Sequence, residues 1–315
     1  MAQTIGVAGF TGKFARCVVN SLLQNPGISV RGFCRDPSKL PLSVTASSRI
    51  TIIKGDFNDK DALQTFVAGT DVVICCYLGD AELMSEGQKL LIDACVAKNV
   101  PRYIAGDFSV DITNIPYGAL PPKDPCKDIL KYIESKDIQG IHILIGVFME
   151  TFWSDFMQIW DPKQKRLSYW GTGHEIWEST TYGNAADYTA AVAMDTTAVG
   201  IQQFLGDRKS LIEIAEIFAK VYGYEPDLHN LGALEDLHQS MHKSLQINLA
   251  DVMAWMPKFF FYWSQNEDTR LKKDLDNTNY SHVVPVTFED FIRCHKFEEL
   301  ASAADNLTFE IPDRS

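Results

Sequence analysis

Short apolar runs alternate with segments of helical periodicity along the first half of the chain. The runs predict strands at residues 5–8, 30–34, 50–54, 71–76, 102–105 and 142–145. They are nearly continuous in apolar residues, as expected of strands buried on both faces of a parallel sheet. The segments between them repeat apolar residues every three or four positions, which predicts helices. This alternation predicts an α/β fold with a doubly wound parallel sheet.

Helical periodicity continues in the second half, most clearly at residues 211–222, 236–242 and 288–303. Ser210, followed three positions later by Glu213, predicts a capping box at the start of the first of these helices. We expect two regions: residues 1–155 carry the sheet, and residues 156–315 form a smaller region. Part of 180–225 is expected to return to the sheet.

The first strand ends in a glycine turn, with Gly9, Gly12 and Ala15 spaced as Gly-x-x-Gly-x-x-Ala. Gly9 permits a tight turn, Gly12 lets the backbone approach a pyrophosphate, and Ala15 lets the helix pack on the strand. The following helix N-terminus offers free N–H groups to the anion. We therefore predict a dinucleotide site; the alternative is a strand–helix turn that merely needs small residues. The residues of this turn expected at the dinucleotide are Gly9, Phe10, Thr11, Gly12, Lys13 and Phe14.

The end of the second strand indicates which dinucleotide is bound. In nicotinamide-binding folds an acidic residue here selects NAD, whereas a nearby arginine accommodates the 2′-phosphate of NADP. Arg35 comes first after the strand and Lys39 follows, while Asp36 precedes Pro37 in a turn-forming pair. These residues favour NADPH; the alternative is two surface cations beside a turn.

Ligands of such sheets bind at the carboxyl ends of the strands. Asp56 follows the third strand, where it could accept a hydrogen bond from the adenine amino group or cap the helix that begins near Lys60. Other residues expected at the cofactor are Phe57, Cys76, Tyr77, Leu78, Asp107, Gly146 and Phe148.

Composition and charge narrow the classes of function. The chain has 315 residues, 46% of them hydrophobic, and a net charge of −12. A negative chain without a basic patch repels nucleic acid, and no apolar run reaches the ~18 residues of a membrane span. Met1 leads directly into the first strand, so we expect no signal peptide, and scattered cysteines favour reduced thiols in a cytoplasmic protein. His238 and His242 lack a third ligand nearby, so we expect no metal.

Several motifs together resemble the NmrA-like and isoflavone-reductase-like branch of the atypical short-chain dehydrogenases. They are the glycine turn, Arg35-Asp36-Pro37, Gly55-Asp56, Asp107-Phe108, Gly146-x-Phe148, Gly171-x-Gly173 and Asp187-Tyr188-Thr189-Ala190-Ala191. The resemblance covers most of residues 1–225. It implies a Rossmann-like domain in residues 1–155, a substrate-binding region after it, and hydride transfer from NADPH.

The resemblance also implies a catalytic lysine on the helix before the sixth strand, three residues ahead of a Val or Ile. Ile129 fits the apolar position, which places Cys126 where the lysine should be. Lys127 is next to it and Lys123 lies one turn earlier, so these two are the candidate catalytic residues, and solvated helix-terminus cations are the alternative. Tyr132 and Lys136 also fit a Tyr-x-x-x-Lys pattern, but they lie at the far end of the helix.

The tryptophans all fall between residues 153 and 263, in the region that should cover the nicotinamide. We expect a hydrophobic, aromatic or polyketide-like substrate of the kind met in secondary metabolism, with a carbonyl or conjugated C=C bond to reduce. Predicted pocket residues are Phe108, Met149, Phe152, Trp153 and Trp255. For the aromatic run 255–263, core packing, a membrane-surface patch or a homodimer contact are alternatives. A non-catalytic, dinucleotide-sensing regulator and a redox-neutral isomerase or dehydratase are the alternative functions.

Overall fold

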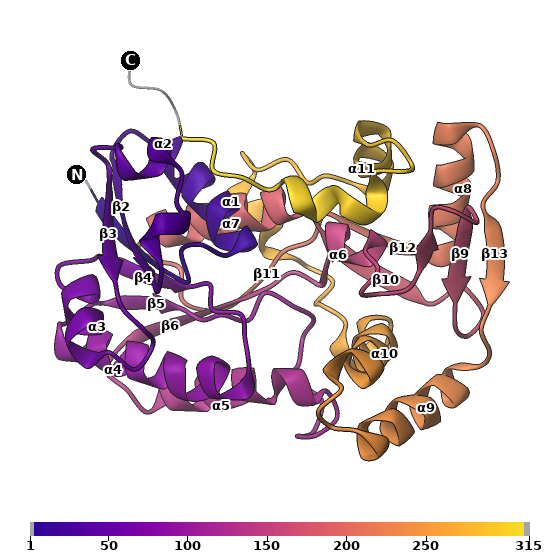
Figure 1. Cartoon of the computed structure of the whole chain (residues 1–315), viewed down its shortest axis with the longest axis horizontal. Coiled ribbons are helices and arrows are strands. Elements are labelled where there is room, and N and C mark those ends of the chain that lie inside the picture. The colour runs from indigo at the N-terminus through magenta and orange to yellow at the C-terminus, as the bar shows by residue number, and fades with distance from the viewer. Residues whose placement is uncertain (1–2, 312–315) are drawn as a thin grey trace.

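The computed structural model describes residues 3–311, which form two parts lying side by side (Figure 1). The first part is built on a seven-stranded sheet in the order β11–β6–β5–β4–β1–β2–β3, and all neighbouring strands are parallel. Its strands are β1 (Gln3–Ala8), β2 (Ile28–Cys34), β3 (Ile50–Lys54), β4 (Val72–Cys75), β5 (Arg102–Ile104), β6 (Gln139–Leu144) and β11 (Gly200–Gln203). The predicted α/β fold with a doubly wound parallel sheet is confirmed.

Helices cover both faces of this sheet (Figure 1). One face carries α1 (Lys13–Leu23) and α7 (Tyr182–Met194), and the other carries α3 (Lys60–Val67), α4 (Gln88–Ala97) and α5 (Asp124–Glu134). A short α2 (Leu42–Thr45) precedes β3. The buried side chains form one apolar cluster on each face, which is why the strands are apolar on both sides.

The second part holds two small sheets and most of the remaining helices. Its strands are β7 (Val147–Phe148), β8 (Trp160–Asp161), β9 (Arg166–Tyr169), β10 (Ile176–Thr180), β12 (Asp207–Ser210) and β13 (Asp227–Asn230). Its helices are α6 (Met149–Trp153), α8 (Leu211–Tyr222), α9 (Leu234–Ile247), α10 (Val252–Ser264) and α11 (Phe288–Cys294). A third apolar cluster, rich in tryptophan and phenylalanine, forms its core.

Short 3-10 or π segments connect these elements: η1 (Pro37–Lys39), η2 (Leu83–Gly87), η3 (Pro121–Lys123), η4 (Glu267–Thr269), η5 (Asp276–Tyr280) and η6 (Leu300–Asn306). Two of them modify predicted helices. The helix ahead of β5 opens with the π turn η2, and the predicted helix 288–303 ends at Cys294 before η6 begins. The capping box of Ser210 and Glu213 is present at the start of α8.

The chain after α11 returns across the molecule to α1 (Figure 1). Asp305 pairs with Lys13 at 2.8 Å, the carbonyl of Leu307 accepts from Arg16, and the ring of Phe309 stacks on Phe10 at 5.3 Å. The last described residues therefore pack beside the glycine turn.

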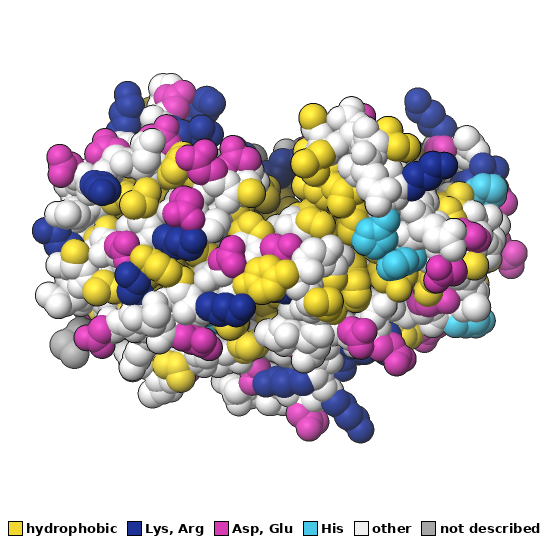
Figure 2. Space-filling model, turned by 90° about the horizontal axis from the view of Figure 1, so that it is seen from below, with side chains coloured by type: hydrophobic (Ala, Val, Ile, Leu, Met, Phe, Trp, Pro, Cys, Tyr) yellow, Lys and Arg dark blue, Asp and Glu magenta, His cyan; other side chains and the backbone are white. Residues whose placement is uncertain are grey.

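Seen from the side of α3, α4 and α5, acidic and basic side chains are interspersed over the sheet-bearing part (Figure 2). Hydrophobic side chains gather over the second part of the molecule in the same view. Between residues 3 and 311, no helix is both long enough and apolar enough to cross a bilayer.

Candidate functional site

The glycine turn after β1 is tight and admits no side chain at Gly9. The backbone N–H groups of Gly9 and Phe10 both donate to the carbonyl of Phe33 at 3.1 Å, which ties the turn to the end of β2. Gly9 has φ +75°, and a Cβ atom there would lie 2.6 Å from the carbonyl oxygen of Cys76. Glycine is therefore required here both by conformation and by the close approach of the β4 strand end.

Helix α1 begins directly after this turn with its N-terminus uncovered. Gly12 is the N-cap, it is exposed, and no side chain caps the first turn of the helix. The first N–H groups of a helix have no partner within it, and the helix dipole adds positive potential at this end. This end of α1 therefore fits the diphosphate of a dinucleotide.

Arg35 is the free cation at the end of β2. It is exposed and makes no hydrogen bond or ion pair with the residues that the structure describes. The carboxylate of Asp36 instead accepts from the N–H and the hydroxyl of Ser38, at 3.1 and 2.6 Å. These hydrogen bonds lower the pKa of Asp36 and hold its carboxylate in the turn. Arg35 and the exposed Lys39 therefore remain available to a phosphate.

The residues after β3 and β4 lie at the same edge of the sheet. Asp56 is exposed and accepts from the N–H of Phe57, whereas the N-cap of α3 is Asp59. The helix-cap alternative for Asp56 is therefore wrong. Cys76 and Tyr77 are buried, but Leu78 is 91% exposed beside the turn.

Four aromatic rings meet where β1, β5 and β6 end. The ring of Phe14 lies 4.3 Å from that of Phe108 and 5.4 Å from that of Phe148. Phe148 stacks on Tyr182 with ring centroids 3.9 Å apart. Gly146, with φ +68°, makes the turn that presents Phe148. The pattern of strand ends identified three of these rings but missed Tyr182, because Tyr182 opens α7, 34 residues after Phe148 in the chain.

Glu150 is a second residue that the sequence analysis missed. It is buried at the start of α6, and its two carboxylate oxygens accept from the N–H of Tyr182 at 3.1 and 3.0 Å. Burial raises the pKa of Glu150 to about 7, although the hydrogen bonds from the backbone oppose this shift. A titratable carboxyl group thus supports the ring that stacks on Phe148.

The two candidate lysines are both held by backbone carbonyls. Lys127 is buried, and its Nζ donates to the carbonyls of Ile115 and Pro116 at 2.8 Å each. The Nζ of Lys123 donates to the carbonyl of Asp107 at 2.6 Å, just past β5. The ammonium group of Lys123 therefore lies nearer the strand ends than that of Lys127. Lys127 instead holds the loop before α5 in place.

Cys126, at the position where the family lysine is expected, is fully buried. Burial raises the pKa of its thiol to about 12, an effect that nearby Lys123 opposes. A buried thiol with a raised pKa keeps its proton and is a poor nucleophile. Tyr132 and Lys136 both bind Asp93 on the outer surface of the helices. They form a surface cluster there.

The predicted aromatic pocket residues of the second half lie in its core. Met149, Phe152 and Trp153 are fully buried, and Trp255 is 6% exposed. Phe152 packs edge-to-face against both Trp153 and Trp177, with ring centroids 5.2 Å apart in each pair. Their role in lining a substrate pocket stays a prediction.

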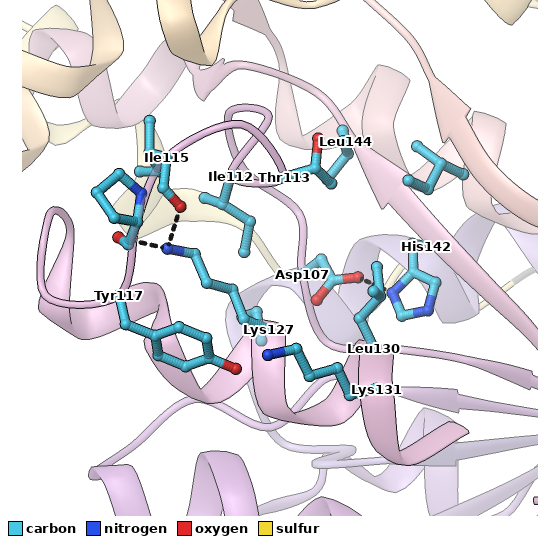
Figure 3. Close-up of a pocket in the computed structure, with 13 residues that line it drawn as sticks. Asp107, Ile112, Thr113, Ile115, Tyr117, Lys127, Leu130, Lys131, His142 and Leu144 are labelled. Carbon is cyan, nitrogen blue, oxygen red and sulfur yellow. Dashed lines mark hydrogen bonds and ion pairs between the residues drawn. The ribbon is translucent and has the colours of Figure 1, made fainter. Parts of the chain in front are cut away.

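A cavity of about 210 Å³ lies instead between α5, β6 and the loop that precedes α5 (Figure 3). Asp107 and His142 lie at one side of it, with Oδ2 of the carboxylate 2.6 Å from Nδ1 of the imidazole. Burial lowers the pKa of His142, but the charge and hydrogen bond of Asp107 outweigh burial and raise it above 6.5. Lys127 and Lys131 border the cavity beside the ring of Tyr117.

In residues 3–311, no three His, Cys, Asp or Glu side chains lie close enough together to bind a metal ion. His238 and His242 contact each other with ring centroids 4.7 Å apart, and they pack against Tyr262 and Phe259.

Several known proteins of similar sequence or structure are named reductases. The isoflavone reductase of Glycine max is 24% identical over 183 residues, which are 55% of this chain and 55% of that protein. The chain thus spans about half the length of the curated relatives it matches. A crystal structure of isoflavone reductase has a TM-score of 0.79 at 17% identity, covering 93% of this chain and 99% of the other. The complex of leucoanthocyanidin reductase with NADPH from Vitis vinifera has a TM-score of 0.76 at 17% identity, covering 95% and 99%.

The similarity to these two solved structures supports the α/β fold described above. The family model described as the NmrA-like family matches residues 1–292, which include the glycine turn, the Arg35 position and nearly all of the second part. The resemblance identified from the sequence motifs is confirmed, and the chain belongs to the NmrA-like family.

Proposed function

We propose that the chain is an NADPH-dependent reductase of a hydrophobic, aromatic or polyketide-like small molecule. The observation that carries this proposal is the uncovered N-terminus of α1 behind a turn that only glycine fits at position 9. When bound there, the nicotinamide supplies a hydride to a carbonyl or conjugated C=C bond. Relatives whose names and titles denote reductases support the same class of reaction.

Charges at the strand ends support NADPH over NADH. Arg35 and Lys39 are exposed and would hold the 2′-phosphate, since Asp36 is bound to Ser38 and does not compete for a ribose hydroxyl. Lys13 pairs with Asp305, but both side chains are exposed, and such a pair contributes about 1 kcal/mol or less. Lys13 can therefore exchange Asp305 for a phosphate at little cost.

The reacting end of the cofactor would lie against Phe14, Phe108 and Phe148. These rings give the reaction an apolar wall that excludes water and suits a flat substrate. Lys123 is the candidate proton-handling group, because its ammonium already lies at the carbonyl of Asp107, past the end of β5. Lys127 would keep the adjoining loop in place.

A second function has one observation in its favour. The resemblance places Cys126 where a catalytic lysine is expected, and Nζ of the nearby Lys127 is occupied by two carbonyls. A non-catalytic protein that binds a dinucleotide and signals its redox state would need no proton donor. The same scaffold could also carry a redox-neutral isomerisation.

Cofactor titration and turnover separate these functions. We expect Arg35→Ala to weaken NADPH binding roughly 10- to 100-fold, the worth of one or two charge-assisted hydrogen bonds, and to change NADH binding less than about twofold. Lys98→Ala, which removes an exposed cation beyond the end of α4, is the control. Equal losses for both cofactors would show that Arg35 does not bind the 2′-phosphate.

Turnover is tested with NADPH and a panel of quinones and enones. Consumption of NADPH with formation of the reduced product supports the reductase. Tight NADPH binding without consumption across the panel would overturn it in favour of the regulator or the isomerase.

A further inference from the structure

The cavity beside α5 lies on the flank of the sheet and reaches the strand ends at Asp107, which follows β5, and at Leu144, the last residue of β6. His142 is in β6, four residues before Gly146, which is about 13 Å along an extended strand. Leu130 and Lys131 come from the second turn of α5, and Ile201 comes from the edge strand β11. The glycine turn contributes no residue to this cavity. The cavity is therefore distinct from the phosphate-binding glycine turn, and it borders the proposed cofactor site at Asp107.

Most of the cavity wall is apolar, and one side of it is polar. Ile112, Ile115, Leu130, Leu144 and Ile201 line the walls. Asp107 is 4% exposed, and its Oδ1 atom has no hydrogen-bond partner among the described residues, while Oδ2 is bound to His142 (Figure 3). A buried carboxylate oxygen without a donor is costly. The cavity thus presents one strong acceptor inside an apolar space, beside the thiol of Cys126, which is only a weak donor.

The surrounding charges select against a cationic ligand. Nζ of Lys127 lies 5.1 Å and Nζ of Lys131 4.6 Å from the centre of the Tyr117 ring, so both ammonium groups flank that ring at one side of the cavity (Figure 3). Asp124 is 3.5 Å from Lys127, whereas Lys131 has no ion pair with any described residue. The donor that Asp107 lacks is therefore expected on an uncharged group, such as a hydroxyl.

The volume limits the size of the ligand. A dry cavity of about 150 Å³ accommodates benzene, so about 210 Å³ accommodates one six-membered ring with a substituent. A ring of this size also suits walls made of leucine and isoleucine.

We propose that this cavity binds a small uncharged alcohol or phenol, with its ring against the apolar walls and its hydroxyl donating to Oδ1 of Asp107. The cavity borders the proposed reductase site at Asp107 and Lys127, but the proposal rests on the lining of the cavity and not on the proposed function.

Phenol and cyclohexanol are the probes, and toluene is a control of the same size that lacks a donor. In a titration followed by NMR we expect both hydroxyl compounds to bind at least tenfold more tightly than toluene, because a hydrogen bond to a charged acceptor is gained. Benzylamine should bind no better than toluene. Saturating NADPH should leave the phenol affinity within about twofold. Equal affinities for phenol and toluene, or displacement of phenol by NADPH, would overturn the proposal.

A blocking variant locates the site. Ile201 lines the cavity from an edge strand and is 38% exposed, so Ile201→Trp should fill the cavity without disturbing the core. Val199→Trp, at a 48% exposed position just before β11 that does not line the cavity, is the matched control. We expect phenol binding to fall at least tenfold in the first variant and to be unchanged in the second.

If Ile201→Trp does not fold, Leu130→Trp fills the same space from α5. Circular dichroism and a thermal melt establish that each variant is folded. Phenol affinity that is unchanged in a folded blocking variant would show that phenol binds elsewhere and would refute the assignment.

Discussion

Replacing Glu150 with glutamine should remove a pH dependence from the stability of this protein. Glu150 is 6% exposed, and burial raises its pKa from 4.5 to about 7. A carboxyl group whose pKa is raised in the fold binds its proton more tightly there than in the unfolded chain. Its contribution to the free energy of unfolding is therefore fully present below pH 4.5 and is lost as the pH rises through 7.

The size of this effect follows from the two pKa values. At about 1.4 kcal/mol for each pH unit between them, the whole loss is about 3 kcal/mol. The protein is least soluble near its isoelectric point of about 5.0, so the measurement begins at pH 5.5. Between pH 5.5 and 8.5 the loss is about 2 kcal/mol, because the fall ends close to pH 7. Glutamine keeps an oxygen that can accept from the N–H of Tyr182 but has no proton to lose.

The assay is urea unfolding at pH values from 5.5 to 8.5, followed by tryptophan fluorescence. The difference in unfolding free energy between the native chain and Glu150→Gln should shift by about 2 kcal/mol in favour of the variant across this range. Glu216→Gln, at an exposed position on α8, should show no such shift. Parallel curves for the native chain and Glu150→Gln would refute the reasoning, since Glu150 would then keep one charge state throughout.

Two further substitutions test the turn and the candidate lysine. Gly9→Ala should abolish NADPH binding in a fluorescence titration, because its Cβ would lie 2.6 Å from the Cys76 carbonyl oxygen. Gly69→Ala is the control for backbone strain, since Gly69 has φ +72° but open space around it. Unchanged NADPH affinity in Gly9→Ala would contradict the proposed turn. Lys127→Met should lower the free energy of unfolding by about 1–3 kcal/mol, because two carbonyls lose their donor, and should leave NADPH affinity unchanged. Unaltered stability with lost reduction would instead make Lys127 catalytic.

The candidate site was only partly accessible from the sequence. The glycine turn and Arg35 could be predicted, because a strand, a turn and a helix that follow one another are a local arrangement. The pairing of Asp107 with His142 joins a residue just past β5 to a residue of β6 that lies 35 positions later, and nothing in the local sequence marks either as a partner of the other. The same is true of Glu150 and Tyr182, which meet because α7 begins beside α6.

The two lysines illustrate the same limit. The family resemblance placed Lys123 and Lys127 near the cofactor, but it could not indicate where their ammonium groups point. The loop before α5 folds back over the helix and places two carbonyls at Nζ of Lys127. A long side chain takes the direction in which its charge finds acceptors, and those acceptors are set by the loop.

For the first half of the chain, the sequence by itself determined the order of the strands and helices, the parallel sheet and the tight glycine turn, because these depend on apolar periodicity and on backbone freedom at single residues. The short strands of the second part, β7 to β10, β12 and β13, were not predicted. Only the tertiary structure decided that Phe148 stacks on Tyr182, that the chain after α11 packs beside the glycine turn, and that one oxygen of Asp107 is left without a donor. Burial, pKa values and hydrogen-bond partners depend on every element packed around a residue, and those elements come from distant parts of the chain.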